Sequence, residues 1–248
     1  MFLAAPFIES KGVTRATNAN AGYHESASAP SEFDTHFGTA RRSSPLPICG
    51  FGFQLARDLE CPPRVGALPG ARQDMVIRDA VKSDVTAIAH LHAESWRSAY
   101  RGILSEDFLE NHAHSDRLAA WQERFSANPR KPMFVIVAND GKQLAGFACV
   151  FPDEDAVFGS FLDNLHVAPR LTGQGIGRRL LSETAARLLT SGSGAGLYLW
   201  VLEQNHRARR FYEKAGGVPA GSVVSSMPDG QRVATLRFHW PVLSSLRL

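Results

Sequence analysis

The chain has few cysteines and no clear set of metal ligands. Its 248 residues contain only Cys49, Cys61 and Cys149, which form neither an even set nor a CxxC pair. We therefore expect reduced thiols and a cytoplasmic location rather than a disulfide scaffold or a zinc site. His112 and His114 are two positions apart and would point in different directions on a helix, so we expect no metal site there either.

Long apolar runs and charge of one sign are also scarce. No stretch of about 18 consecutive apolar residues occurs, so we expect no membrane-spanning helix. The formal net charge is only +3, and residues 1–74 carry seven basic and seven acidic residues, which places the whole excess in residues 75–248. Such a small excess does not favour nucleic acid as a partner.

Regular patterning is missing from residues 1–74. This stretch is rich in Ser, Ala, Gly and Pro, and its Pro-containing turns break any regular element. We expect a mostly disordered extension in front of a domain that covers residues 75–248. We also hypothesise that the native chain starts at Met75, which is a natural first residue for that domain. N-terminal sequencing of the native protein would decide this.

From Met75 onward, apolar periodicity predicts alternating strands and helices, and hence an α/β fold with a central mixed sheet flanked by helices. One helical stripe includes Val85 and Trp96, with Ser83 or Asp84 as its cap, and a second is centred on Trp121. Strands are expected at Met75–Ala80, Met133–Ala138, Gln143–Phe151, Phe158–Val167, Leu197–Val201, Val218–Ser226 and Arg232–Trp240.

The most informative segment joins a strand to a helix through three alternate glycines. Gly173, Gly175 and Gly177 allow positive φ and remove side chains from one side of the turn, and the helix behind them presents unpaired N–H groups. These features favour a bound anion such as phosphate. A Walker A loop is excluded because Arg178 and Arg179 stand where it needs Lys and a hydroxyl residue. A dinucleotide fingerprint is excluded because Arg178 occupies the place of its third glycine.

A second element lies downstream of the glycine turn. Asn205 is a suitable N-cap, and Gly216 is a suitable residue to end the helix between them. Asn205 and Tyr212 lie two helical turns apart, so both can contact one elongated ligand. Arginines near both elements supply a basic patch for a polyanionic cofactor, although we expect at least half of them to be solvated. They are Arg170, Arg178, Arg179, Arg207, Arg209 and Arg210.

With these motifs in this order, residues from about Met75 to Trp240 resemble the GNAT superfamily of acetyl-CoA-dependent N-acetyltransferases. The resemblance rests on the first strand, the segment Glu94–Leu104, the glycine turn and the helix with Asn205 and Tyr212. It implies the GNAT fold, a central and mostly antiparallel sheet whose two middle strands splay apart, flanked by helices.

Two positions depart from the family pattern. Thr172 stands where the family usually has Arg or Gln, which implies that the turn holds pyrophosphate mainly through backbone N–H groups. Gly217 stands where a large apolar residue is common, which predicts a looser turn after the second helix.

The resemblance implies acetyl-CoA as co-substrate, no metal, and direct transfer of the acetyl group to a primary amine in a ternary complex. Backbone groups of Leu165, His166 and Val167 would contact the pantetheine arm and polarise the thioester carbonyl. Asn205 would hydrogen-bond the arm, and Tyr212 would protonate the leaving thiolate as general acid. The residues implied for the pyrophosphate are Thr172, Gly173, Gln174, Gly175, Ile176, Gly177 and Arg178.

The general base stays open at this level. The candidates are Asp163 and His166 on the strand, Glu94 on the first helix, and water. Strand alternation predicts that Asp163 and His166 face opposite sides of the sheet. Trp96 and Tyr100 are candidates for lining the acceptor pocket, although Trp96 also lies on the apolar stripe of its helix, which favours a core position.

The expected acceptor is a small-molecule or peptide amine, with no nucleic-acid or membrane partner and with a homodimer left open. A non-catalytic acyl-CoA sensor of the same fold is an alternative, and so is another donor such as succinyl-CoA, because the glycine turn contacts only the phosphate end. Thiol release from acetyl-CoA with a panel of amines separates an enzyme from a sensor.

Overall fold

The computed structural model describes residues 75–127, 131–141, 143–193 and 196–246. The disordered extension expected at residues 1–74 lies outside the described residues. The hypothesis that the native chain starts at Met75 rather than Met1 therefore stays a prediction.

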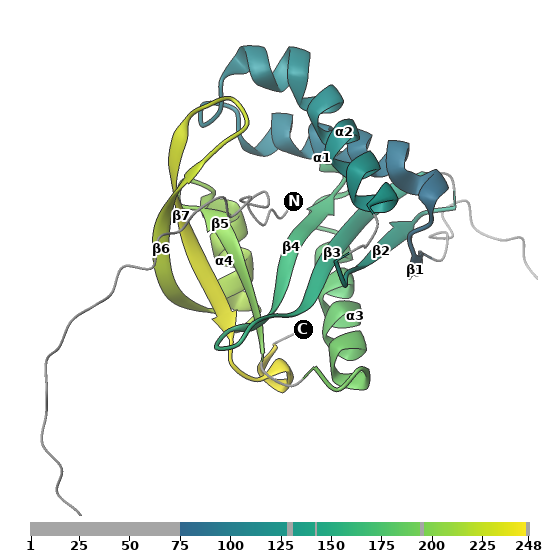
Figure 1. Ribbon diagram of the computed structural model, residues 1–248, viewed down its shortest axis with the longest axis vertical. Coiled ribbons are helices and arrows are strands. Elements are labelled where there is room, and N and C mark those ends of the chain that lie inside the picture. The colour runs from purple at the N-terminus through teal and green to yellow at the C-terminus, as the bar shows by residue number, and fades with distance from the viewer. Residues whose placement is uncertain (1–74, 128–130, 142, 194–195, 247–248) are drawn as a thin grey trace, which may run out of the picture. The chain divides into compact units, whose positions relative to one another are not determined.

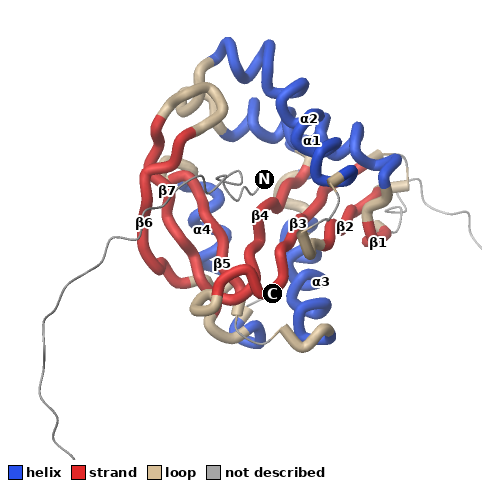
Figure 2. The backbone as a smooth tube through the Cα atoms, viewed as in Figure 1, coloured by secondary structure: helices blue, strands red, loops and turns tan. Residues whose placement is uncertain are grey.

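One sheet runs through the described residues, with its strands in the order β1-β2-β3-β4-β5-β7-β6 (Figures 1 and 2). The strands are β1 (Val76–Asp79), β2 (Phe134–Asn139), β3 (Leu144–Asp155), β4 (Gly159–Val167), β5 (Leu197–Leu202), β6 (Val218–Ser226) and β7 (Arg232–Trp240). All neighbouring pairs are antiparallel except β4 and β5, which are parallel. The predicted mixed α/β fold with a mostly antiparallel sheet is therefore confirmed.

Helices cover both faces of this sheet (Figure 1). The helices are α1 (Val85–Ala99), α2 (Ala113–Ser126), α3 (Ile176–Thr190) and α4 (His206–Lys214). The α1 and α2 pair contributes Ile88 and Trp121 to one hydrophobic core, and α3 contributes Leu180 to a second core that also includes Tyr212 of α4. Every residue of β4 is buried, because this strand lies between the two cores.

The start of α1 differs in detail from the prediction. Asp84 is the residue before the helix, as expected, but its side chain does not cap the helix. Its carboxylate instead accepts hydrogen bonds from the Val81 backbone N–H at 2.8 Å and from Arg78 at 2.7 Å. The side chain thus ties β1 to the turn that precedes α1.

A β-bulge in β4 overturns the predicted alternation of its side chains. Leu162 pairs with Val150 and Asn164 with Cys149, so Asp163 is the extra residue between them. Asn164 donates to Asp163 and also contacts His166 through its Oδ1. Asp163 and His166 therefore lie on the same face of the sheet, toward α1 and α2, and their predicted placement on opposite faces is wrong.

The turn after α4 is tightly packed rather than loose. A Cβ atom on Gly217 would lie 2.7 Å from the Trp240 ring, so the indole occupies the space that a side chain would need. The Trp240 indole N–H donates to the Ala215 carbonyl at 3.0 Å, and the Gly217 N–H donates to the Tyr212 carbonyl at 2.9 Å. The predicted loose turn is wrong because an aromatic side chain from β7 fills the gap.

We expect Gly217→Ala to lower the free energy of unfolding by about 1–3 kcal/mol, because the added methyl group overpacks the core against Trp240. Urea denaturation measures this loss. An unchanged unfolding midpoint for Gly217→Ala would contradict the packing described above.

Candidate functional site

Strands β4 and β5 part after a short stretch of pairing. Only Ser160 with Leu197 and Phe161 with Tyr198 are paired in the register between them. Beyond these residues, β4 continues to Val167 and β5 to Leu202 with no ladder between them in the described chain. Backbone N–H and C=O groups along the end of β4 are therefore available to an extended ligand.

The end of β4 leads into the glycine turn. Gly173 and Gly175 have φ values of +84° and +82°, and a Cβ atom on either would have no other atom within 4 Å. Gly175 is the N-cap of α3 and provides no side-chain cap, so the amides of the first helical turn have no capping partner. A cavity of about 360 Å³ lies here, lined by Val167, Leu171, Gly173, Gly175, Ile176, Gly177, Arg178 and Phe211.

The side chains around this turn are mostly engaged elsewhere. The Thr172 hydroxyl donates to the Pro169 carbonyl at 3.0 Å, which closes the turn internally. Arg170 donates to Gln143 at 2.7 Å, and Arg179 donates to the Met75 carbonyl at 3.0 Å. Of the six arginines expected to form a basic patch, Arg178 is the one that lines the cavity. The anion-binding capacity of the turn therefore resides mainly in its backbone.

Asn205 caps helix α4, which carries Tyr212 and contributes Phe211 to the cavity at the glycine turn. Asn205 is 5% exposed, and its Oδ1 accepts from the Ala208 N–H at 3.1 Å, as expected for an N-cap. Its Nδ2 is buried and has no hydrogen-bond acceptor among the described residues. An amide donor of this kind can bind a ligand carbonyl.

Tyr212 is completely buried among aromatic rings. It packs against Phe211, Phe238 and Trp240, with ring centres 5.3–6.0 Å apart. Burial raises the pKa of Tyr212 well above its ordinary value, and the nearby Tyr100 hydroxyl adds to the rise. The hydroxyl is therefore protonated at neutral pH, which is the state of a proton donor.

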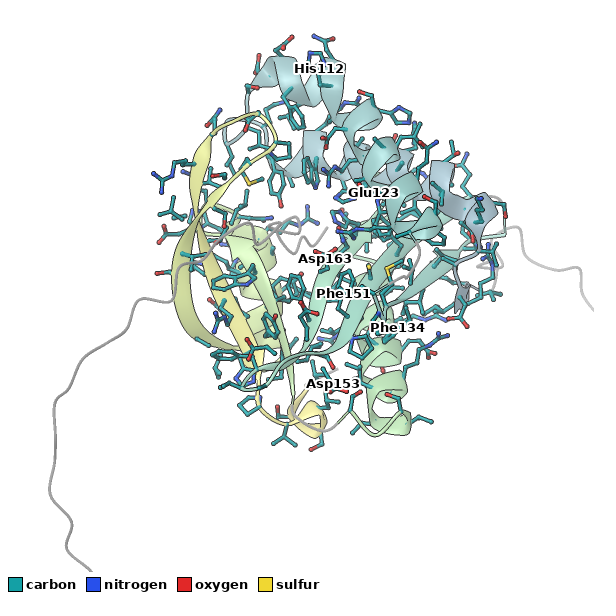
Figure 3. All side chains as sticks on the ribbon, in the orientation of Figure 1. His112, Glu123, Phe134, Phe151, Asp153 and Asp163 are labelled. Atoms are coloured by element: carbon teal, nitrogen blue, oxygen red, sulfur yellow. The ribbon has the colours of Figure 1, made fainter. Side chains whose placement is uncertain are left out.

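A buried polar network lies on the other side of β4. The carboxylate of Asp163, which Figure 3 labels on β4, is paired with Arg124 of α2 at 2.5 Å and accepts a hydrogen bond from Asn164. Its second oxygen, Oδ1, has no partner within the described part of the chain. Burial raises the pKa of Asp163, and the Arg124 guanidinium opposes that rise. One oxygen of this buried carboxylate thus has no hydrogen-bond donor within the described residues.

Of the other two base candidates, His166 already has partners and Glu94 lies at the outer surface. His166 is fully buried, and its ring nitrogens contact the Ser95 hydroxyl at 3.0 Å and Asn164 Oδ1 at 3.3 Å. Burial lowers the pKa of His166 well below its ordinary value, so the ring is neutral. Glu94 lies on the outer side of α1, next to His90 at 3.7 Å, and lines a surface groove with Arg170.

Replacing Arg124 with methionine is expected to cost about 3–5 kcal/mol of folding free energy near neutral pH, because it leaves Asp163 buried without a counter-charge. Loss of the guanidinium removes the opposition to the raised pKa of Asp163. A folded-state pKa above the unfolded one favours folding at low pH, so the loss should shrink from about pH 8 to about pH 5. Urea denaturation at both pH values tests this. The double variant Arg124→Met with Asp163→Asn should recover most of the loss near pH 8, and an equal loss at both pH values would contradict the account.

The two residues predicted to line the acceptor pocket lie at the end of α1: Trp96 is in its last turn and Tyr100 directly follows it. Trp96 and Tyr100 are fully buried, and the Arg117 guanidinium lies 4.4 Å from the Trp96 ring centre. Trp96 thus has the core position that its stripe predicts. Asp229, in the turn between β6 and β7, accepts from the Ser105 N–H at 2.8 Å and links that turn to the loop after α1.

Sequence analysis missed the arginines on this side. Arg117 and Arg124 are seven residues apart on α2, on either side of buried Trp121, so both point toward the sheet. The sequence could have indicated them, because both arginines share a helix face with the apolar residue Trp121. Arg237 on β7 gave no such signal, because its neighbours come from distant strands.

The two histidines considered as metal ligands lie away from the opening between β4 and β5. His112 lies at the outer end of the helix layer, beside Asp107 at 3.4 Å (Figure 3), and His114 packs against His90 of α1.

Within the described residues, no helix combines the length and the apolar character needed to cross a lipid bilayer.

The sequence matches known proteins over the region that builds this site. Residues 88–217 match the model of the acetyltransferase (GNAT) family. The uncharacterized N-acetyltransferase YuaI of Bacillus subtilis is 29% identical over 181 residues, which cover 70% of this chain and 96% of that protein. A probable N-acetyltransferase of Mycobacterium tuberculosis is 33% identical over 138 residues, which cover 56% of this chain and 76% of that protein.

The fold also matches solved structures. The PaiA N-acetyltransferase of Thermoplasma acidophilum, solved in complex with coenzyme A, superposes with a TM-score of 0.51 at 21% identity. The match covers 67% of this chain and 99% of that one.

Proposed function

Because the chain belongs to the acetyltransferase (GNAT) family, we propose that it transfers the acetyl group of acetyl-CoA to a primary amine, which attacks the thioester directly in a ternary complex. The observation that carries the proposal is the parting of β4 and β5 beside the glycine turn. An open strand edge that runs into a helix N-terminus suits a ligand with an amide-containing arm and a pyrophosphate.

Acetyl-CoA would lie along this opening. The amides of Gly173 to Arg178 would hold the pyrophosphate, with Arg178 as the charged side chain at the cavity wall. The backbone of Leu165, His166 and Val167, which has no ladder partner on the β5 side, would pair with the pantetheine arm. The Asn205 Nδ2, which has no acceptor among the described residues, would donate to one of its carbonyls. The coenzyme A complex of the Thermoplasma relative supports this class of ligand.

The transfer forms a C–N bond and breaks the thioester C–S bond, while one proton leaves the nitrogen and one reaches the sulfur. The amine nitrogen would attack the thioester carbonyl carbon, and backbone N–H groups at the end of β4 would stabilise the negative oxygen of the tetrahedral intermediate. As the C–S bond breaks, the Tyr212 hydroxyl would donate its proton to the leaving thiolate. The products are coenzyme A and an N-acetylated amine.

The amine must lose a proton, and Asp163 is the candidate that the geometry favours. Its Oδ1 lacks a partner in the described chain, whereas both His166 nitrogens have contacts and Glu94 faces the outer surface. The raised pKa of Asp163 makes it a stronger base than an ordinary carboxylate. We propose that Asp163 Oδ1 accepts the proton, directly or through one water.

Initial-velocity kinetics with acetyl-CoA and a panel of amines test this function. Direct transfer in a ternary complex predicts double-reciprocal lines that intersect. Parallel lines would indicate an acetylated enzyme intermediate and would contradict direct attack. Acetyl-CoA binding without turnover of any amine would instead support the acyl-CoA sensor.

A further inference from the structure

The acceptor side of the sheet carries a half-buried arginine with no acidic partner. The guanidinium carbon of Arg237, on β7, lies 3.9 Å from the Phe158 ring centre and 4.4 Å from that of Trp200. Its Nε is buried and has no hydrogen-bond acceptor in the described chain, and no described carboxylate forms an ion pair with it. An unpaired cation in such a place is costly, and ring contacts offset only part of the cost.

The acidic groups near this arginine are already engaged. The charge of Glu154 also reaches Tyr198, but its carboxylate is paired with Lys131. The charge of Asp155 reaches Tyr198 and His239, both of which lie beside Arg237 in the sheet. The Oδ1 of Asp155, however, accepts the backbone N–H groups of Val157 and Phe158 at 2.8 and 2.9 Å. Asp155 thus serves the turn between β3 and β4 rather than the guanidinium.

The base candidate lies on the same face of the sheet. Tyr198 lies near both groups. The Arg237 guanidinium lies 5.8 Å from its ring centre. The charge of Arg237 lowers the pKa of Tyr198 and the charge of Asp163 raises it. Asp163 Oδ1 is a buried acceptor with no partner among the described atoms. A cationic donor and an anionic acceptor thus flank one aromatic surface, and neither has a complete set of partners.

Two further guanidinium groups lie near this surface, and each is paired with a carboxylate. Arg117 is 8% exposed and lies over Trp96, with Asp116 as its ion-pair partner, while Arg124 is paired with Asp163. Their charges reach Asp163 and His92 as well. Arg237 thus differs from these two arginines in having no carboxylate partner within the described chain, and a ligand carboxylate would supply one.

We propose that the acceptor is a free amino acid, with its ammonium group against Asp163 Oδ1 and its carboxylate bound by Arg237 between Phe158 and Trp200. This assignment rests on the proposed function, because it names the substrate class of the same cleft. The planar guanidinium fork can bind a carboxylate through two parallel hydrogen bonds. During transfer the carboxylate is unchanged. The ammonium nitrogen loses one proton to Asp163 before it attacks and a second proton to solvent from the tetrahedral intermediate, so the product is an amide. The leaving sulfur takes the proton of Tyr212, which solvent replaces.

The test compares amines that differ only in the carboxylate. Phenylalanine is paired with phenethylamine and lysine with cadaverine, and phosphoethanolamine paired with ethanolamine distinguishes phosphate from carboxylate. We expect kcat/KM to favour the amino acid by about 10- to 100-fold in at least one pair. Arg237→Gln should bring that ratio close to one while the Kd for acetyl-CoA stays unchanged, and Arg237→Lys should keep part of the preference.

Arg232→Gln is the matched control, since Arg232 is an exposed arginine on the same strand, and it should keep the full preference. Equal or better turnover of the decarboxylated amines would overturn the amino-acid assignment and leave the acetyltransferase function standing. Preference for phosphoethanolamine over all amino acids would do the same, as would an Arg237→Gln variant that loses activity equally on both members of a pair. Failure of the native protein to bind acetyl-CoA would instead overturn the proposed function, and the assignment with it.

Discussion

Replacing Gly175 with aspartate is expected to weaken acetyl-CoA binding on the order of 100-fold or more. Gly175 has a φ of +82°, and a Cβ atom there would have no other atom within 4 Å. The aspartate side chain would therefore extend into the open space beside the first turn of α3. There its carboxylate would repel the pyrophosphate and would compete for the same backbone N–H donors. Isothermal titration calorimetry with acetyl-CoA measures the change in Kd.

Gly175→Asn separates charge from shape. Asparagine has nearly the same size as aspartate, and both tolerate positive φ better than other non-glycine residues, so the two variants should lose similar stability. We expect the asparagine variant to stay within about tenfold of the native Kd, because it adds no charge. Equal weakening by both variants would show a steric effect, and native affinity in both would contradict the assignment of the turn to pyrophosphate.

Tyr212→Phe is expected to lower kcat by about 10²- to 10⁴-fold, the range typical of a lost general acid. The phenylalanine ring fills the same space against Phe238 and Trp240, so stability and acetyl-CoA affinity should change little. Because the pKa of Tyr212 lies well above its ordinary value, its hydroxyl keeps its proton through the neutral and mildly alkaline range. Native turnover should therefore show no alkaline loss below about pH 10 that depends on this residue.

Steady-state kinetics and calorimetry on the same samples test the role of Tyr212. Tyr100→Phe removes a buried hydroxyl whose charge state influences Tyr212, and it should lower kcat far less, because Tyr100 is not proposed to donate the proton. Unchanged turnover in Tyr212→Phe would remove this residue from the mechanism. A matched loss of acetyl-CoA affinity would assign it to binding instead.

Local patterns predict much of this fold. Alternation and turn residues placed all seven strands. The predicted positive φ is confirmed at Gly173 and Gly175 but not at Gly177, which lies inside α3. The N-cap role of Asn205 also follows from local chemistry, since its side chain bonds a backbone amide three residues away. These features depend on a few neighbouring residues, which is why one sequence suffices to predict them.

Features that depend on distant contacts were not predictable. The bulge at Asp163 arises from the register between β3 and β4, and it reverses the faces that strict alternation assigns. Gly217 packs tightly only because Trp240 comes from another strand. The same holds for Arg237, whose aromatic partner Phe158 is far away in the sequence. The glycine turn and the cap of α4 were thus largely predictable from the sequence, and the packing on the α1 and α2 side of β4 was not.

The most direct test of the account follows both products of one reaction. The full chain is mixed with acetyl-CoA, with and without a primary amine, and free thiol and N-acetylated amine are quantified in the same samples by colorimetry and mass spectrometry. The account predicts equal amounts of coenzyme A and N-acetylated amine, formed only when the amine is present. Bound acetyl-CoA that releases no thiol with any amine, or thiol release that does not depend on the amine, would contradict it.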